Sequence, residues 1–282
     1  MSILPDIPPD ICEYAINTNG ITSPLVIDLP HGGGIYPDDF RASCPQRALE
    51  LCEELYLNDL YTPPTLTAGG VVIAAKFPRT YIDVNRAIND IDPLLFDKDW
   101  TEPTDPNGRS IHGHGVIMRL IRAGEPIYHR ALTHDEAHTR IEKYYSCYHN
   151  TLNHFLNTAH EKFGVVYHLN CHSMPSSVLN AHFPHAPPDF ILGDKDGRSC
   201  GLEFRNRVAN ALKDMGYRVA INQLYKGAEI ITRYGQPAWG QHSLQIEINR
   251  ALFQNENTGE KNKNFNQLQS DIEKLILHIN DR

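Results

Sequence analysis

Residues 24–34 read PLVIDLPHGGG, an apolar run that is followed at once by a histidine and three glycines. A similar pattern returns at residues 165–172, VVYHLNCH, where another histidine closes an apolar run. Short apolar runs bounded by turn-forming residues are typical of buried strands. We predict strands over six ranges of the chain: 25–29, 71–75, 165–170, 190–192, 218–222 and 244–249.

Helical patterns lie between these runs, with apolar residues recurring every three or four positions. The clearest one spans residues 134–163, where Thr133 and Glu136 have the spacing of a capping box and Gly164 ends the pattern. Three further helices are expected over 45–60, 199–215 and 263–280. Strands that alternate with helices predict an α/β fold.

The chain of 282 residues is long enough for one large domain. Residues 88–124 are rich in Asp, Pro, Gly and His and show no periodicity. Because the α/β pattern resumes after them, we interpret this segment as a long excursion near a functional site and not as a linker. We therefore expect a single domain over residues 1–282.

The charge balance restricts the class of partner. Asp and Glu number 34 against 26 Lys and Arg, a formal charge of −8. Nucleic acids and anionic membranes require a basic surface, so neither is an expected partner. A small anionic substrate remains compatible with this charge if arginines line a local pocket.

Sequence features of location point to the cytoplasm. The first basic residue is Arg41, so we expect no secretion or transit signal, and the apolar run 71–75 is much too short for a membrane span. The six cysteines are scattered without a C-x-x-C pair, which favours reduced thiols over a disulfide framework or a zinc ribbon.

Three groups that can take part in metal chemistry lie at strand ends or on the last strand. His31 and His172 each close a predicted strand, and Glu247 lies in the last one, on the face opposite Leu244, Ile246 and Ile248. Two imidazoles with a nearby carboxylate suit Zn²⁺ and a water molecule activated beside it. Two simpler interpretations stay open: His31 as a turn residue, and Glu247 as the exposed side of a half-buried strand.

Several other motifs admit more than one interpretation. Arg79 and Arg86, in RTYIDVNR, are candidates for binding a carboxylate through two parallel hydrogen bonds, or else surface residues in ion pairs. His112 and His114 flank a glycine and belong either to a metal site or to a flexible loop. The run Asp194-Lys195-Asp196-Gly197 is typical of a surface turn, because the later acidic ligands of a calcium loop are missing.

Taken together, long segments of the chain resemble the N-formylglutamate amidohydrolase family. They occur in the family's order and span nearly the whole chain: PLVIDLPHGGG (24–34), RTYIDVNR (79–86), residues 124–149, LNCHSMPS (169–176), DFILGDKDGRSC (189–200) and residues 216–253. This family is similar to the zinc carboxypeptidases, so the resemblance implies a three-layer α/β fold with a mixed central sheet flanked by helices.

The resemblance also implies roles for individual residues. His31 and His172 correspond to zinc ligands, and Glu247 corresponds to the catalytic carboxylate. Asn85 and Arg86 lie where the substrate carboxylate is held, with Arg79 and Arg233 as further candidates. The remaining ligand is expected to be an acid on the helix after the first histidine; Glu54 matches best, while Glu53, Asp38 and Asp39 stay open.

The implied activity is zinc-dependent hydrolysis of N-formyl-L-glutamate to formate and L-glutamate, in histidine catabolism. The family's acidic stretch is altered at residues 53–58, and Ala228 follows Gly227 where a glycine pair is expected. Those departures leave open a related amidase for another N-acyl amino acid. A separate alternative is a non-catalytic protein that binds an amino-acid derivative on the same scaffold. The sequence does not define an oligomeric state.

Overall fold

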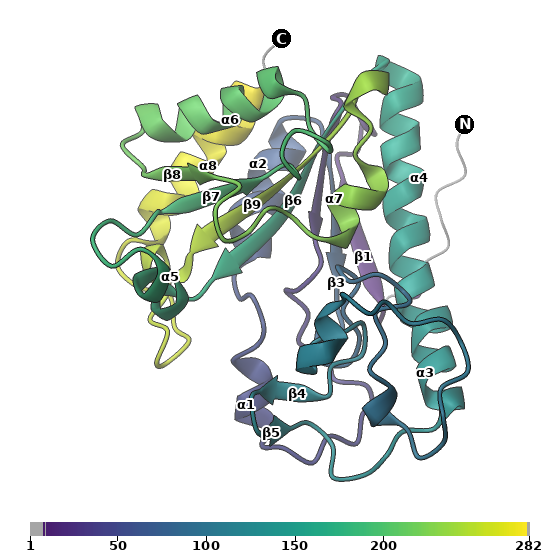
Figure 1. Cartoon of the computed structure of the whole chain (residues 1–282). Helices are drawn as coiled ribbons and strands as arrows, with labels where there is room; N and C mark the ends of the chain where they lie inside the picture. Colours follow the sequence, from purple (N-terminus) through teal and green to yellow (C-terminus); the bar gives the residue numbers. More distant parts are fainter. Residues whose placement is uncertain (1–7, 9, 281–282) are drawn as a thin grey trace.

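A mixed seven-stranded sheet lies between two layers of helices in the computed structural model, which describes residue 8 and residues 10–280 (Figure 1). Its strands are β1 (Cys12–Ile16), β2 (Leu25–Leu29), β3 (Val71–Ala75), β6 (Val166–Met174), β7 (Phe190–Gly193), β8 (Val219–Ile221) and β9 (Gln241–Asn249). They are ordered β1-β3-β2-β6-β9-β7-β8. Within this sheet the β1–β3 and β7–β9 pairs are antiparallel and the other four pairs are parallel, so the predicted α/β fold with a mixed central sheet is confirmed.

All six predicted strands are present, although some of their ends differ from the sequence analysis and further strands were not predicted. Strand β6 continues to Met174, so His172 lies inside the strand and not after it. The pairing of β6 with β9 extends this far, since nine residues of each strand are in register. Strand β1 was not predicted, because CEYAI is short and mixes polar with apolar residues at the edge of the sheet.

The helices cover both faces of the sheet. One face packs against α2 (Leu57–Thr67), α6 (Leu202–Asp214) and α8 (Phe265–Asn280). The other packs against α3 (His134–Arg140) and α4 (Ser146–Phe163), joined by a π-helical turn over Ile141–Tyr145, and against α7 (Glu229–Tyr234). The long predicted helix over 134–163 is therefore confirmed, including the capping box of Thr133 and Glu136.

The predicted helix over 45–60 is wrong. It is divided into α1 (Gln46–Glu50) and the start of α2, with an irregular loop over residues 51–56 between them. The backbone N–H of Glu54 donates to the carbonyl of His31 (3.0 Å), and Tyr56 has a left-handed backbone conformation (φ 66°). Because this loop is tied to the end of β2, its residues cannot continue the helix.

The excursion over residues 88–124 packs onto the same face as α4. Its buried residues Ile91, Leu95, Val116 and Ile117 belong to one apolar cluster with the strands of the sheet. The segment contains two single-turn 3₁₀ helices and the strand β4 (Leu120–Arg122), which pairs with β5 (Glu125–Pro126). It therefore adds a wall beside the sheet, as Figure 1 shows below β3.

The short helix α5 (Ser176–His182) follows β6. All six cysteines are free thiols. Among the described residues, no helix combines the length and the apolar character that crossing a bilayer requires.

Candidate metal and substrate site

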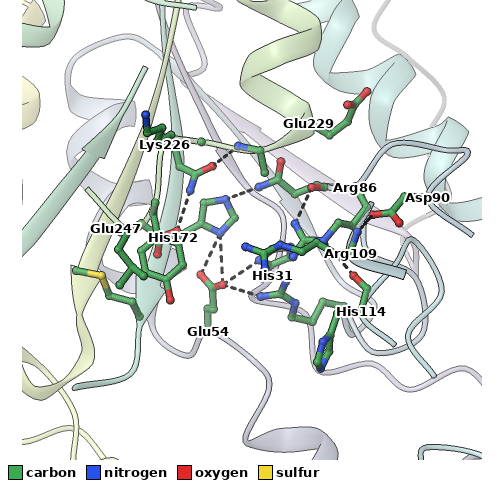
Figure 2. A pocket seen from close by; sticks show the side chains of 18 of the residues that line it. His31, Glu54, Arg86, Asp90, Arg109, His114, His172, Lys226, Glu229 and Glu247 are labelled. Atoms are coloured by element: carbon green, nitrogen blue, oxygen red, sulfur yellow. Dashed lines mark hydrogen bonds and ion pairs between the residues drawn. The ribbon is translucent and has the colours of Figure 1, made fainter. Parts of the chain in front are cut away.

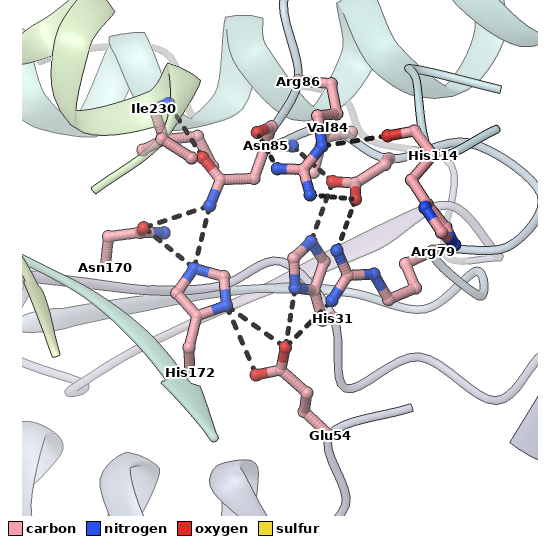
Figure 3. Close-up of polar contacts among 12 residues, drawn as sticks. His31, Glu54, Arg79, Val84, Asn85, Arg86, His114, Asn170, His172 and Ile230 are labelled. Carbon is pink, nitrogen blue, oxygen red and sulfur yellow. Dashed lines mark hydrogen bonds and ion pairs between the residues drawn. The ribbon is translucent and has the colours of Figure 1, made fainter. Parts of the chain in front are cut away.

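Three buried side chains from distant parts of the chain converge at the carboxyl ends of β2 and β6. One ligand atom from each of His31, Glu54 and His172 lies within 4.8 Å of the other two, and each residue is 2% exposed (Figure 3). Glu54 Oε1 is 2.9 Å from His31 Nδ1 and 3.3 Å from His172 Nδ1. Two imidazole nitrogens and a carboxylate oxygen form a donor set that suits Zn²⁺.

Local structure explains how each side chain reaches this point. His31 follows the end of β2, and His172 lies on the adjacent parallel strand β6, so the two side chains emerge at the same edge of the sheet. Glu54 is carried by the loop that is bonded to the His31 carbonyl. Its second oxygen accepts the backbone N–H of Ser173 (2.7 Å), which fixes the carboxylate against β6.

Polar neighbours fix the orientation of both histidine rings. His31 Nε2 lies 2.8 Å from Asp83 Oδ1, and His172 Nε2 lies 2.9 Å from Asn170 Oδ1. When each Nε2 donates its proton to these oxygens, Nδ1 of each ring offers its lone pair beside Glu54. Such outer contacts select the tautomer that binds a metal.

Arg79 holds the two acids of the centre in place. Its guanidinium donates to Glu54 Oε1 (3.2 Å) and to Asp83 Oδ2 (2.6 Å). Burial raises the pKa of Glu54, but the attraction of His172 and His31 outweighs it and holds the pKa well below its usual range. For Asp83, burial is likewise outweighed, here by Arg79 and then His31, so its pKa is also well below its usual range.

A second buried carboxylate, that of Asp28, orients His172 indirectly through Asn170. Asp28, which is fully buried, accepts hydrogen bonds from Tyr148 Oη (2.7 Å) and Asn170 Nδ2 (3.0 Å), and lies 2.8 Å from His168 Nε2. Asn170 therefore joins Asp28 to the ring of His172. The carboxylate orients the amide, and the amide orients the histidine.

Glu247 is the neighbour of His172 on the adjacent strand, since the two residues are paired in the β6–β9 register. It is 6% exposed, and its Oε1 accepts a hydrogen bond from Gln245 Nε2 (2.8 Å). Burial raises the pKa of Glu247 to about 7, with His172 opposing the shift and Glu54 adding to it. A half-exposed strand does not describe this position, because Glu247 is nearly buried and lines a cavity.

The cavity beside these residues has a volume of about 650 Å³. In Figure 2, Glu247 and His172 lie on one side of it, and Arg86, Arg109 and Asp90 lie on the opposite side. Asn85 lies between the two sides: its Nδ2 donates to Asn170 Oδ1 (3.4 Å), the oxygen that also faces His172 Nε2, and its Oδ1 accepts the N–H of Ile230 (3.0 Å). The cavity thus combines a candidate metal centre, a buried carboxylate and cationic groups.

Other candidates from the sequence lie elsewhere. Arg233 is exposed and points to Tyr145 Oη (3.4 Å), outside the set of residues that line the cavity. Asp38 and Asp39 are exposed, and Asp39 accepts a hydrogen bond from Tyr81. Arg79 lines the cavity but is engaged with the two acids.

Glu53 is buried, but neither of its carboxylate oxygens has a hydrogen-bond partner. Burial, opposed by Arg79, raises its pKa well above the usual range. Among the described residues, it is Glu54 and not Glu53 that groups with the two histidines. Of the His112–His114 pair, His114 lines the cavity wall, and neither residue belongs to this group.

Sequence reasoning missed Asp83 and Asn170 as groups that orient the histidines. Asp83 lies within RTYIDVNR, where attention to carboxylates as well as arginines would have found it. Asn170 is two residues from His172 on the same face of β6, a position that strand alternation makes visible. Arg109 and Lys195 also line the cavity, and no local pattern identified them.

The glycine-rich turn after His31 provides a test of how closely the site is packed. A Cβ at Gly33 would overlap the backbone of Lys76 and Phe77, whereas a Cβ at Gly34 would meet nothing within 4 Å. We expect Gly33→Ala to lower the free energy of unfolding by about 1–3 kcal/mol. Gly34→Ala, the matched control, should leave the free energy of unfolding nearly unchanged. Urea unfolding of both variants measures the difference. Equal stability of the two variants would contradict the predicted close contact at Gly33.

Comparisons with known proteins identify one matching family model and two similar proteins from Pseudomonas species. Residues 23–254 match the family model described as N-formylglutamate amidohydrolase. The N-formylglutamate deformylase of Pseudomonas putida is 29% identical over 241 residues, which cover 83% of this chain and 82% of that protein. The corresponding protein of Pseudomonas aeruginosa is 26% identical over 237 residues, with 83% of each chain covered.

Solved structures extend the comparison to three dimensions. The crystal structure of N-formylglutamate amidohydrolase from Ralstonia eutropha JMP134 is 39% identical, with a TM-score of 0.90 that covers 96% of this chain and 98% of that one. A gene product of Agrobacterium tumefaciens is 13% identical with a TM-score of 0.63, covering 95% of this chain and 93% of that one, and it shares the fold alone.

Proposed function

The chain belongs to the N-formylglutamate amidohydrolase family and is a hydrolase that acts on an amide bond, and we propose that it hydrolyses N-formyl-L-glutamate to formate and L-glutamate with the help of one bound Zn²⁺. The observation that carries this proposal is the convergence of His31, Glu54 and His172 beside the buried Glu247. Convergence of this kind also disfavours the non-catalytic binding protein.

His31 Nδ1, His172 Nδ1 and an oxygen of Glu54 are the atoms that would hold the ion. Zn²⁺ in such a site lowers the pKa of a bound water and polarises an amide carbonyl. Asp83 and Asn170 support this role, because their contacts with the two Nε2 atoms leave both Nδ1 atoms for the ion. Arg79 prevents Glu54 from turning away.

Glu247 acts as the general base and then as the general acid. Because Oε1 is engaged with Gln245, Oε2 is the atom that accepts the proton of the attacking water. The same oxygen then delivers the proton to the nitrogen of the leaving amine. Burial near His172 keeps this carboxylate next to the reacting amide and away from bulk water.

Arg86 and Asn85 position the substrate. The Arg86 guanidinium lines the cavity and is held by the carbonyl oxygens of His114 (3.2 Å) and Asn85 (3.0 Å). A carboxylate of the substrate bound there would direct the formyl amide toward Glu247. We assign Arg79 to the positioning of Glu54 and Asp83, and Arg233 is not required by this arrangement.

One observation favours a related amidase as the second candidate. Leu51 and Leu224 line the cavity and are 51% and 37% exposed, so the mouth offers apolar surface that a formyl group does not need. An N-acyl amino acid with a larger acyl group would cover this surface. The two candidates differ only in the acyl group, and the reaction type is the same.

A panel of N-formyl-, N-acetyl- and N-succinyl-L-glutamate separates the two candidates. We expect the highest kcat/KM for the formyl compound, measured as formate release by a coupled dehydrogenase assay and as L-glutamate release for all three. A higher kcat/KM for either larger acyl group would contradict the deformylase assignment and favour the related amidase. Cytoplasmic location, which the features of the sequence favour, and a role in histidine catabolism, which the family resemblance implies, are further parts of the proposal.

A further inference from the structure

The cavity contains three cationic side chains whose charges no nearby acid neutralises fully. Arg86, Arg109 and Lys195 all line it. The nearest carboxylate to Arg86 is that of Asp83, 3.9 Å away and already bonded to Arg79 and close to His31. Within the part of the chain that the structure describes, the side chains of Arg109 and Lys195 make no hydrogen bond and lie within 4.0 Å of no carboxylate.

Arg109 comes from the excursion over residues 88–124, and a buried acid holds it in place. Asp90, which is 3% exposed, accepts the backbone N–H groups of Arg109 (2.9 Å) and Ser110 (2.8 Å). A Cβ at Gly108 would overlap the carboxylate of Asp90, so the close approach requires glycine there. The excursion therefore places Arg109 at the cavity wall, and the hydrogen bonds to Asp90 hold its backbone there (Figure 2).

Lys195 comes from the turn after β7, which a second buried acid fixes. The fully buried Asp194 accepts hydrogen bonds from Asn222 Nδ2 (2.6 Å), from the N–H of Gly197 (2.9 Å) and from Arg205 (3.1 Å). Lys195 has a left-handed backbone conformation (φ 54°), which residues other than glycine rarely adopt. The predicted surface turn is thus tightly anchored, and its lysine is half-buried at the cavity.

Like charges gathered around one cavity repel one another, which disfavours the charged forms of Lys195 and Arg86. Burial lowers the pKa of Lys195, and Arg198 and Arg86 lower it further. Burial also lowers the pKa of Arg86, with Arg109 among the cations that add to the shift. Glu229 attracts Lys195 only from beyond ion-pair distance. An anionic ligand between these cations would relieve the repulsion.

We propose that Arg109 and Lys195 form a second anion subsite, which binds the side-chain carboxylate of a dicarboxylic N-acyl amino acid while Arg86 binds its α-carboxylate. The inference rests on the proposed function, because the metal centre and Glu247 define where the amide lies. Two carboxylates then require two sets of cations, and the cavity supplies both. Selectivity for a dicarboxylic amino acid over a neutral one comes from Arg109 and Lys195.

The test compares two substrates that differ in a single group, N-formyl-L-glutamate and N-formyl-L-glutamine. For Lys195→Met and Arg109→Met, we expect kcat/KM on the glutamate compound to fall roughly 10- to 100-fold, mainly through KM, because each variant loses a charge-assisted hydrogen bond. The glutamine compound should lose less than about 3-fold, as it has no charge for these groups to bind. The ratio of the two kcat/KM values is therefore the decisive quantity.

Matched variants control for charge and for folding. Lys213→Met removes one positive charge from an exposed position of α6 and should leave the ratio unchanged. Lys195→Arg keeps the charge and should retain most of the preference for the glutamate compound. An equal loss for both substrates in Lys195→Met or Arg109→Met would overturn the assignment of that residue.

A binding measurement separates failure of the subsite from failure of the proposed function. If the wild-type protein releases no formate from N-formyl-L-glutamate, the proposed function fails. Calorimetry with L-glutamate and L-glutamine then tests the subsite alone: tighter binding of L-glutamate that both methionine variants abolish supports it. Equal binding of the two amino acids by the wild-type protein overturns it.

Discussion

The Glu247→Gln variant is expected to fold and bind metal like the wild-type protein, while kcat for formate release falls by roughly 10²- to 10⁴-fold. The amide side chain has nearly the shape of the carboxylate and can still meet Gln245, but it cannot accept the proton of the attacking water. Because the substrate carboxylates bind to other residues, KM should change little. Steady-state kinetics with N-formyl-L-glutamate measures both constants.

Three results define the interpretation of this variant. Metal content and the midpoint of thermal unfolding should equal those of the wild-type protein, which excludes a structural cause for the loss. A kcat within about 3-fold of wild type would remove Glu247 from the role of general base. A large rise in KM with kcat unchanged would instead place it among the substrate-binding groups.

The second large effect concerns the metal ligands, and two adjacent glutamates provide a matched pair. We expect Glu54→Gln to weaken metal binding by more than about 100-fold, because loss of a direct ligand should exceed the 10- to 100-fold effect of losing an outer contact. Glu53→Gln should keep its metal, since the Glu53 oxygens have no partner and burial favours the neutral acid. Equilibrium dialysis against a zinc-buffered solution measures the affinity.

His172→Ala extends the same measurement to the second strand. Its loss should lower the zinc-to-protein ratio as strongly as Glu54→Gln does, because His172 Nδ1 lies beside the same carboxylate oxygen. Zinc retained at the wild-type ratio in His172→Ala would exclude His172 as a ligand. Metal lost from Glu53→Gln but kept by Glu54→Gln would assign the ligand to the neighbouring acid instead.

The sequence was sufficient to predict the groups that regular strands position. His172 and Glu247 are recognisable because a strand places alternate residues on one face, and the two strands are in register where these residues lie. His31 is recognisable because it follows an apolar strand and precedes glycines. Both inferences need only local patterns and the rule that parallel strands end at one edge of the sheet.

Residues held by irregular backbone could not be derived from local patterns. Glu54 was selected by resemblance, and its expected helix is a loop, because the hydrogen bond to the His31 carbonyl joins residues 23 positions apart in the chain. Lys195 and Arg109 depend on buried acids, Asp194 and Asp90, whose hydrogen bonds become visible only in the folded chain. No periodicity marks such contacts.

Formate release from N-formyl-L-glutamate, measured as zinc is added to metal-free protein, is the most direct test of the central claim. We predict almost no release without metal and a rise in rate that reaches its maximum at one equivalent of zinc per chain. Full activity in protein shown by mass spectrometry to contain no divalent metal would contradict the account.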